Sequence, residues 1–328
     1  MNPPARSWQP SASLAVLRLR AALKARIRAY FAATQALEVD TPALSSAAQT
    51  DPHIAPLTTR LGVAPDATYF LHSSPEFPMK RLLAAGVGDC WQFARVFRDG
   101  ERGRYHNPEF DLLEWYRVGA DHHALMDDVE ALLTAVVGPE RAVPRARRLR
   151  YAEAFVTHAA VDPLTADAAR LREAACDGGL EPVPGLADDD HCGWLDRILS
   201  GLVAPALAAD TPTFLYDWPA EQGALARLDE SDARVARRFE LYWGELELAN
   251  GFHELIDASE QRRRFEADRA RRAHGGQDPV VMDERLLAAL EAGLPDCAGV
   301  ALGFDRLVMI AAGLEHIDQA LAFPLEDA

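Results

Sequence analysis

Acidic residues are concentrated in one apolar segment, FELYWGELELANGFHEL, which contains Glu240, Glu245, Glu247 and Glu254. A two-residue hairpin turn at Trp243-Gly244 would place Glu240 directly opposite Glu247. Two like charges in that position are unfavourable, unless a hard cation lies between them, and Mg²⁺ commonly binds one or two protein carboxylates. The segment therefore predicts a divalent-metal site at Glu240 and Glu247, with a solvated hairpin face as the alternative.

A second polar group surrounds the loop RDGERGRYHN, which joins two apolar strands. Arg98 stands just before this loop, where its planar guanidinium could hold a phosphate through two hydrogen bonds. On the returning strand, the two-residue period places Leu112, Glu114 and Tyr116 on one face. A carboxylate within an apolar strand needs a partner, so Glu114 indicates either a substrate ammonium group or a buried ion pair with an arginine.

A third group is the segment GVALGFDRL, near the C-terminus. Its glycines allow the backbone to approach a ligand, and Asp305 could cap the helix that follows. Arg306 lies in the first turn of that helix, where a cation opposes the helix dipole, so an anionic ligand is expected nearby. Neither a GxGxxG nor a GxxxxGK[ST] loop occurs. The two arginines and the acidic pair therefore predict a nucleotide held on an antiparallel sheet.

The elements that must position these residues follow from apolar spacing and turn residues. Ser11 or Ser13 could cap the first helix, and Ser73 or Ser74 with Pro75 could open the second. Helices are expected at residues 14–35, 76–86, 122–137, 259–274 and 283–292. Strands are expected at 37–42, 69–71, 90–97, 108–118 and 238–249, with a strand and then a helix across 299–313.

Domain organisation is predicted from the weak patterning of residues 139–235, which carry 8 of the 21 prolines. We expect this region to be an insertion or helical subdomain within one domain that spans residues 1–328. The strands lack regular alternation with helices, which favours an α+β fold with a mainly antiparallel sheet. The basic residues before Glu38 resemble those of an organellar transit peptide, but their continuous apolar stripe predicts a structural helix.

Composition limits the possible partners. The 328 residues include 34 Lys and Arg against 50 Asp and Glu, a formal net charge of −16, which argues against a broad nucleic-acid surface. The four cysteines form no CxxC pair, and the longest uncharged apolar run, 198–209, is too short to cross a membrane. A cytoplasmic protein without a membrane partner is expected.

The segments EVDTP, FR…HNPEF…LEWY, ELANGFHEL and GVALGFDR resemble, in this order, motifs 1, 2 and 3 of class II aminoacyl-tRNA synthetases, closest to the lysyl-tRNA synthetase catalytic domain. The match begins near residue 13 and reaches the C-terminus. RYHNPEF, LEWY, ELANGFHEL and PDCAGVALG more closely resemble the free-standing paralogues that modify elongation factor P. The resemblance implies a class II catalytic fold and an ATP-dependent ligase that forms an adenylate of (R)-β-lysine and transfers it to a lysine side chain of elongation factor P.

Site residues are implied by position within these motifs. Arg98 and Arg306 would be the catalytic pair, and Glu240 and Glu247 would hold Mg²⁺. ATP contacts are implied for Arg98, Asp99, Gly100, Asn107, Glu247, Leu248, Gly303 and Arg306. Amino-acid contacts are implied for Ser74, Pro75, Glu76, Glu114, Tyr116, Glu254 and Ala301.

Two positions depart from the synthetase pattern. Gly100 stands where motif 2 usually has glutamate, with Glu101 next, which affects the contacts expected on the adenine side. Ala301 replaces the glycine of the lysyl enzymes. Its methyl group narrows the amino-acid pocket near the α-carbon, and the resemblance implies a preference for β-lysine over α-lysine.

The acceptor is expected to be a protein, because the match leaves no room for the N-terminal anticodon-binding barrel and tRNA is then disfavoured. Motif 1 usually forms the dimer interface of this fold, so a homodimer is predicted. Two alternatives are a truncated lysyl-tRNA synthetase that charges α-lysine and an inactive synthetase-like protein that binds an amino acid and regulates another process.

Overall fold

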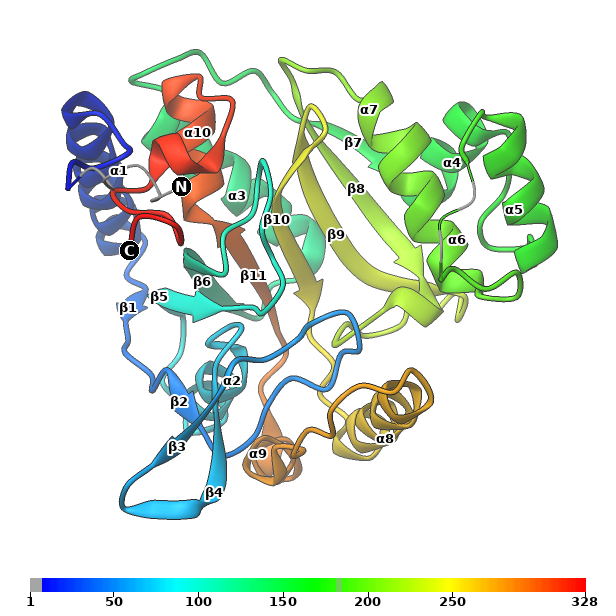
Figure 1. The fold of residues 1–328 in the computed structure, drawn as a ribbon, viewed down its shortest axis with the longest axis horizontal. Helices are drawn as coiled ribbons and strands as arrows, with labels where there is room; N and C mark the ends of the chain where they lie inside the picture. Colours follow the sequence, from blue (N-terminus) through cyan, green and yellow to red (C-terminus); the bar gives the residue numbers. More distant parts are fainter. Residues whose placement is uncertain (1–7, 182, 184) are drawn as a thin grey trace, which may run out of the picture.

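The computed structural model describes residues 8–181, 183 and 185–328, and within them an eight-stranded sheet forms the centre of the molecule (Figure 1). Its strands, in spatial order, are β1 (Leu37–Glu38), β5 (Cys90–Phe97), β6 (Glu109–Val118), β11 (Cys297–Gly303), β10 (Leu246–His253), β9 (Val235–Trp243), β8 (Pro212–Pro219) and β7 (Arg147–Arg150). The β1–β5 and β7–β8 pairs at the two edges are parallel, and the inner pairs are antiparallel. The predicted α+β class with a mainly antiparallel sheet is confirmed.

One face of the sheet is covered by three helices, α1 (Leu14–Ala33), α3 (His122–Val137) and α10 (Phe304–Ala312), which share its main hydrophobic core. The Ser13 hydroxyl caps α1 by accepting from the Val16 N–H. The strands alternate as expected: Leu113 and Trp115 of β6 lie in this core, and Leu112, Glu114 and Tyr116 lie on the opposite face. That opposite face remains available for a site.

Residues 139–235 extend the sheet and add a helical layer beside it (Figure 1). Strands β7 and β8 come from this region. Its helices are α4 (Tyr151–Ala159), α5 (Ala168–Asp177), α6 (His191–Ile198), a π-helical turn (Leu199–Val203) and α7 (Ala204–Ala206). Their apolar side chains form a separate core against Leu215 and Trp218 of β8. The region is thus joined to the sheet through its strands, and its description as an insertion stays a prediction.

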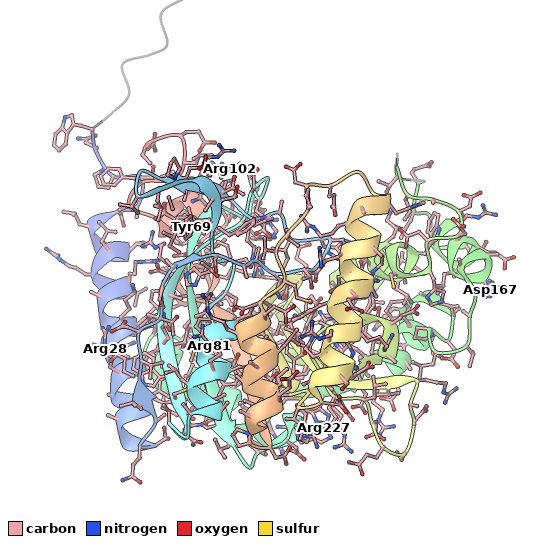
Figure 2. The ribbon with its side chains drawn as sticks, turned by 90° about the horizontal axis from the view of Figure 1, so that it is seen from below. Arg28, Tyr69, Arg81, Arg102, Asp167 and Arg227 are labelled. Carbon is pink, nitrogen blue, oxygen red and sulfur yellow. The ribbon has the colours of Figure 1, made fainter. Side chains whose placement is uncertain are left out.

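The remaining elements lie at the lower edge of the sheet in Figure 1, where they border the face that the three helices leave open. A small sheet contains β2 (Leu44–Ser45), β4 (Ala64–Leu71) and β3 (Thr58–Leu61). Helices α2 (Glu76–Ala84), α9 (Glu284–Gly293) and α8 (Ala258–His274) lie side by side (Figure 2). Two 3₁₀ turns span Ala220–Gln222 and Ile317–Ala320. No helix in the described ranges has both the length and the apolarity to span a bilayer.

The β9–β10 hairpin corrects the predicted register. Its two-residue turn is Gly244-Glu245 rather than Trp243-Gly244, because Gly244 adopts φ +61° at the first central position, which favours glycine. A β-bulge between Glu247 and Ala249 then shifts the pairing, so Glu240 faces Asn250 and Glu247 faces Tyr242. The bulge reverses the alternation of side chains. Glu247 therefore shares the open face with Glu240, diagonally rather than directly opposite.

The start of α10 also differs from the expectation. Asp305 does not cap this helix, whose N-cap is Gly303 without a side-chain hydrogen bond. Instead, the buried Asp305 carboxylate pairs with Arg20 of α1 and accepts from the Asp111 N–H at 2.8 Å. Asp305 thereby fixes the helix that carries Arg306 to both α1 and β6.

Candidate active site

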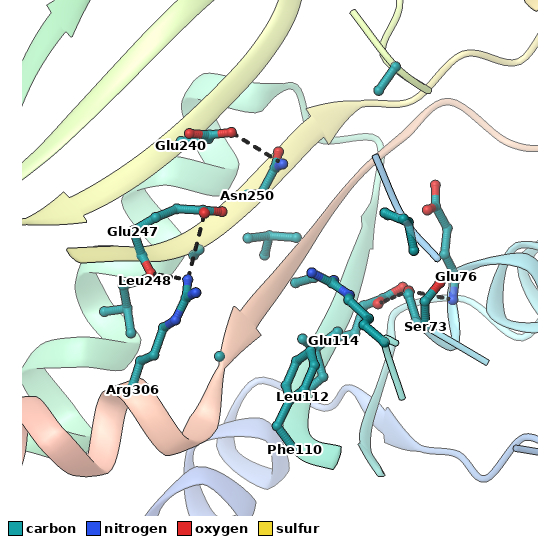
Figure 3. Close-up of a pocket in the computed structure, with 18 of the residues that line it drawn as sticks. Ser73, Glu76, Phe110, Leu112, Glu114, Glu240, Glu247, Leu248, Asn250 and Arg306 are labelled. Carbon is teal, nitrogen blue, oxygen red and sulfur yellow. Dashed lines mark hydrogen bonds and ion pairs between the residues drawn. The ribbon is translucent and has the colours of Figure 1, made fainter. Parts of the chain in front are cut away.

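A pocket of about 400 Å³ opens on the uncovered face of the central strands (Figure 3). Backbone pairing places Glu240, Asn250, Ala301 and Glu114 in one row across β9, β10, β11 and β6. The next row contains Phe252, Gly299 and Tyr116. The sheet register therefore places two polar ends in one pocket. The first end contains Glu240, Glu247 and two arginines, and the second lies deep between β6 and α2.

The first end contains the predicted carboxylate pair. Glu240 is buried and accepts from the Tyr242 hydroxyl at 2.6 Å, while Arg238 pairs with its other oxygen. Burial and the neighbouring Glu247 raise the pKa of Glu240 to about 7. The Asn250 amide points toward Glu240, yet its buried Oδ1 has no hydrogen-bond partner (Figure 3). Two carboxylates and an unsatisfied amide oxygen are the oxygen donors that a hard divalent cation prefers.

Arg306 extends from α10 toward this carboxylate pair (Figure 3). It donates to the Glu247 carbonyl at 2.6 Å and lies 3.6 Å from the Glu247 carboxylate. It also donates to His106 Nε2 at 2.8 Å. Burial and Arg306 lower the pKa of His106, so the ring stays neutral and accepts this hydrogen bond. Arg306 is therefore fixed in orientation while 19% of its side chain remains exposed to the pocket.

Arg98 enters the same end of the pocket from the β5–β6 loop. Its guanidinium stacks on Phe110 at 5.1 Å and pairs with Glu101 at 3.4 Å. Its buried Nε has no hydrogen-bond partner. Glu101, the residue after Gly100, is thus in contact with Arg98. A guanidinium with an unsatisfied donor and a single long ion pair can accept an anionic ligand such as a phosphate.

The second end is a buried cluster of charged groups. Glu76, Lys80, Glu114 and Glu254 are each at most 7% exposed. The Lys80 ammonium lies 2.7 Å from Glu76 and 2.6 Å from Glu254. Burial and Glu76 raise the pKa of Glu114 to about 8. Burial also raises the pKa of Glu254 to about 8, although Lys80 acts in the opposite direction. The cluster by itself therefore resists full ionisation and favours a cationic ligand.

Hydrogen bonds and a glycine fix the geometry of this cluster. The hydroxyls of Ser74 and Tyr116 donate to the two oxygens of Glu114, at 2.6 and 2.8 Å. The same Ser74 hydroxyl accepts from the Glu76 N–H at the start of α2. A Cβ atom at Gly299 would overlap the Tyr116 ring and a Glu254 oxygen. Glycine at this position is what lets these two side chains approach β11 so closely.

Residues 49–54 form one rim of the pocket, where Gln49, Asp51, His53 and Ile54 line it. The buried Arg272 of α8 donates to the carbonyl oxygens of Asp51 and Ile54, at 2.9 and 3.1 Å. Helix α8 therefore anchors this rim from outside the pocket.

Most of the predicted site residues line this one pocket, among them Leu248, Ala301 and Gly303. Asn107 also lines it, but its amide already bonds the Glu109 carbonyl and the Leu325 N–H. Asp99 and Gly100 lie exposed at the turn of the loop, outside the pocket lining. Pro75 is buried behind Ser74 and is also outside the lining.

Sequence reasoning missed four residues of the site, Lys80, His106, Arg238 and Asn250. The spacing of Glu76 and Lys80, one helical turn apart, is also typical of an ordinary surface ion pair. His106 and Asn250 each lie within a segment that carried the family resemblance, RYHNPEF and ELANGFHEL. Membership in those two motifs was the signal by which His106 and Asn250 could have been found from the sequence.

Comparisons with known proteins identify the family of the chain. The chain matches the family model described as tRNA synthetases class II (D, K and N) over residues 7–327. It is 49% identical to a protein of Vibrio parahaemolyticus named elongation factor P--(R)-beta-lysine ligase, over 97% of this chain and 98% of the relative. Proteins of the same name from Vibrio cholerae and Yersinia enterocolitica are each 47% identical, over 98% and 97% of this chain and 98% of each relative. The chain therefore belongs to the class II tRNA synthetase (D, K and N) family.

Proposed function

We propose that this protein is an ATP-dependent ligase that activates (R)-β-lysine as an adenylate and transfers it to a lysine side chain of elongation factor P. Family membership supports the use of ATP, and the names of the relatives support the two substrates. The observation that carries the proposal is the buried cluster of Glu76, Glu114 and Glu254 in the same pocket as Arg98 and Arg306. Such a pocket suits a diamine at one end and a triphosphate at the other.

In the first step, a carboxylate oxygen of the amino acid attacks the α-phosphorus of ATP, and the bond to pyrophosphate breaks. The attacking carboxylate is already ionised, so this step needs no side-chain base. Arg98 and Arg306 would hold the phosphate oxygens and neutralise the developing charge. In the second step, the neutral acceptor amine attacks the acyl carbon, AMP leaves with the electron pair of the mixed anhydride bond, and the new amide nitrogen releases a proton to solvent.

Mg²⁺ belongs to the proposal as the cation held by Glu240 and Glu247. The unsatisfied Oδ1 of Asn250 and the raised pKa of Glu240 fit a site that a divalent cation completes. When bound, Mg²⁺ would neutralise phosphate charge. Arg238 already pairs with Glu240, so the protein itself offsets part of the carboxylate repulsion.

The acceptor and the assembly are further parts of the proposal. The relatives have nearly the same length as this chain and are named for a protein acceptor, which supports elongation factor P rather than tRNA. A homodimer through the motif 1 region is supported by β1, an edge strand on which Leu37 is 54% exposed. The proposed location is the cytoplasm, where elongation factors work.

The decisive experiment measures ATP–pyrophosphate exchange with (R)-β-lysine and with α-lysine in parallel, and then adds elongation factor P or tRNA to the more active mixture. Faster exchange with (R)-β-lysine and label on elongation factor P are expected. Faster exchange with α-lysine and label on tRNA would instead indicate a lysyl-tRNA synthetase. No exchange with either amino acid would indicate an inactive, amino-acid-binding protein.

A further inference from the structure

Lys80 is a buried cation that the proposed reaction does not use. It lies on α2, one turn after Glu76, and 1% of it is exposed. Its ammonium contacts Glu76 and Glu254, at 2.7 and 2.6 Å. Burial alone would lower the pKa of Lys80, but the two carboxylates more than offset this and raise it. Lys80 therefore remains charged beneath the amino-acid pocket.

The other groups around Lys80 decide the charge of the cluster. Glu76 comes from α2, Glu114 from β6 and Glu254 from the end of β10. Burial raises the pKa values of Tyr116, Cys90 and Cys297, so these side chains are neutral near pH 7. Within the described residues, the cluster thus combines three carboxyl groups with one ammonium group.

Buried charges are stable only when they are compensated. When all three carboxyl groups are ionised, they and Lys80 leave two negative charges, and a diamino acid supplies two ammonium groups. Without Lys80 the cluster would have one more negative charge than such a substrate neutralises. Without one carboxylate it would have one too few.

We propose that Lys80 is a resident counter-ion that sets the number of ammonium groups the pocket accepts at two, and so makes the pocket selective for diamino acids. This inference rests on the proposed function only in requiring that the activated substrate is a diamino acid, whichever isomer of lysine that is. Lys80 acts through Glu76 and Glu254, and is therefore a positioning residue. A purely structural role would be to tie α2 to the end of β10.

The test compares K80M, E254Q and the double variant K80M/E254Q in the full chain. The Met and Gln side chains approximate the sizes of those they replace, and Gln keeps an acceptor oxygen. KM and kcat for the preferred lysine isomer are measured by ATP–pyrophosphate exchange at about pH 8.5, where proton uptake by the carboxyl groups is small. Each single variant should raise KM. The double variant, whose cluster again has two negative charges, should have a KM about tenfold below that of E254Q.

A KM for the double variant equal to or above that of E254Q would overturn the proposal, because a structural role predicts that two losses accumulate. This comparison does not require K80M alone to fold. A second measurement uses (R)-3-aminohexanoic acid, which lacks the distal amine. The wild type should prefer the diamine strongly, E254Q should lose most of that preference, and the double variant should regain part of it. An unchanged preference in E254Q would also overturn the proposal.

Failure of the proposed function would give a different result. In that case the wild type would show no exchange with either lysine isomer. A wild type that exchanges normally beside a double variant worse than E254Q would reject the role of Lys80 alone.

Discussion

The two ends of the pocket place their charges in different ways (Figure 3). After their proposed ligands, the end with Glu114 and Glu254 is called the amino-acid end, and the end with Glu247 and Arg98 the phosphate end. At the amino-acid end, Glu114 and Glu254 are at most 2% exposed and are bonded to groups of the protein itself. At the phosphate end, 40% of the Glu247 side chain and 27% of the Arg98 side chain are exposed. Buried polar atoms of Arg98 and Asn250 there have no partner. The charged groups of one end are thus bonded within the protein, whereas the other end has buried polar atoms that its proposed ligands would satisfy.

This difference follows from the elements that build each end. The amino-acid end lies on the middle of β6 and β11 and on the first turns of α2, where hydroxyl groups and Lys80 hold the carboxyl groups in place. The phosphate end lies on a hairpin close to its turn and on the loop after β5. In the proposed function, recognition of a small amine and binding of a large anion would therefore use different parts of one sheet.

The largest effect is expected for Glu247→Ala, which tests the phosphate end. Glu247 is partly exposed, so its loss should leave the fold intact. The exchange rate should fall by about 1,000-fold or more, because the proposed Mg²⁺ site loses a carboxylate ligand and the cation that would neutralise phosphate charge is bound less well. Steady-state exchange and a melting curve measure the two properties. Glu245→Ala is the matched control, since Glu245 lies in the same hairpin and pairs with Arg104 outside the pocket. Exchange near the wild-type rate in Glu247→Ala would show that the phosphate end is assigned wrongly.

A smaller and different effect is expected for Glu114→Gln at the amino-acid end. Loss of this buried charge should raise KM for (R)-β-lysine by about 100-fold, with a smaller change in KM for ATP, because an ammonium group loses its counter-charge. Exchange assays at varied concentrations of each substrate separate the two constants. Glu109→Gln on the same strand, where an exposed Glu109 pairs with Arg95, should behave as the wild type. Equal changes in both KM values would contradict the division of the pocket into two ends.

The pH dependence of stability gives a third, smaller effect. The pKa values of Glu114 and Glu254 are raised to about 8 in the folded, ligand-free protein, above the ordinary value of 4.5. The native state then binds more protons than the unfolded state, so these groups lower the free energy of unfolding as pH rises from about 4.5 to 8. A bound diamine removes this penalty.

The thermal shift caused by (R)-β-lysine should therefore be larger at about pH 8.5 than at about pH 6, as measured by calorimetry or dye-binding melts. In Glu114→Gln the difference between the two pH values should shrink. A shift that is the same at both pH values in the wild type would show that the carboxyl groups are already ionised in the empty pocket.

The sequence predicted the strands that carry the amino-acid end better than the hairpin of the phosphate end. The alternation in β6 correctly places Glu114 and Tyr116 on one face, because residues two apart share a face on any strand. The hairpin register was wrong, because the turn began one residue later and a bulge followed. The turn is set locally by the positive φ of Gly244. Leu248, at the bulge, packs into the main hydrophobic core, a tertiary contact that residue spacing alone does not show. The shared face of Glu240 and Glu247 was nevertheless correct.

The missed residues share a similar cause. Lys80 forms an ion pair with Glu254, which is distant in the sequence and adjacent only in the fold, so its place in the cluster could not be predicted locally. Asn250 faces Glu240 only because of the bulge. Asp305 was expected to cap a helix, and its true partners, Arg20 and the backbone of Asp111, come from two other elements. Local sequence patterns therefore identify polar residues in apolar segments, whereas contacts between distant segments determine the partners of those residues.

The smallest effect is expected for Ala301→Gly, at the junction of the two ends. Ala301 stands between Asn250 and Glu114 in the row across the sheet, so its methyl group lies where the amino acid must turn from the ammonium pocket toward the phosphates. Removing one methyl group changes discrimination by about tenfold, and the change should favour α-lysine relative to (R)-β-lysine. The ratio of kcat/KM values for the two isomers measures it, with Ala298→Gly as the control for loss of a methyl group, because Ala298 lies on the same strand, is buried in the main core and is outside the pocket lining. An unchanged ratio in Ala301→Gly would mean that the Ala301 methyl group does not distinguish the two positions of the amine. The isomer would then be selected by the buried carboxylates alone.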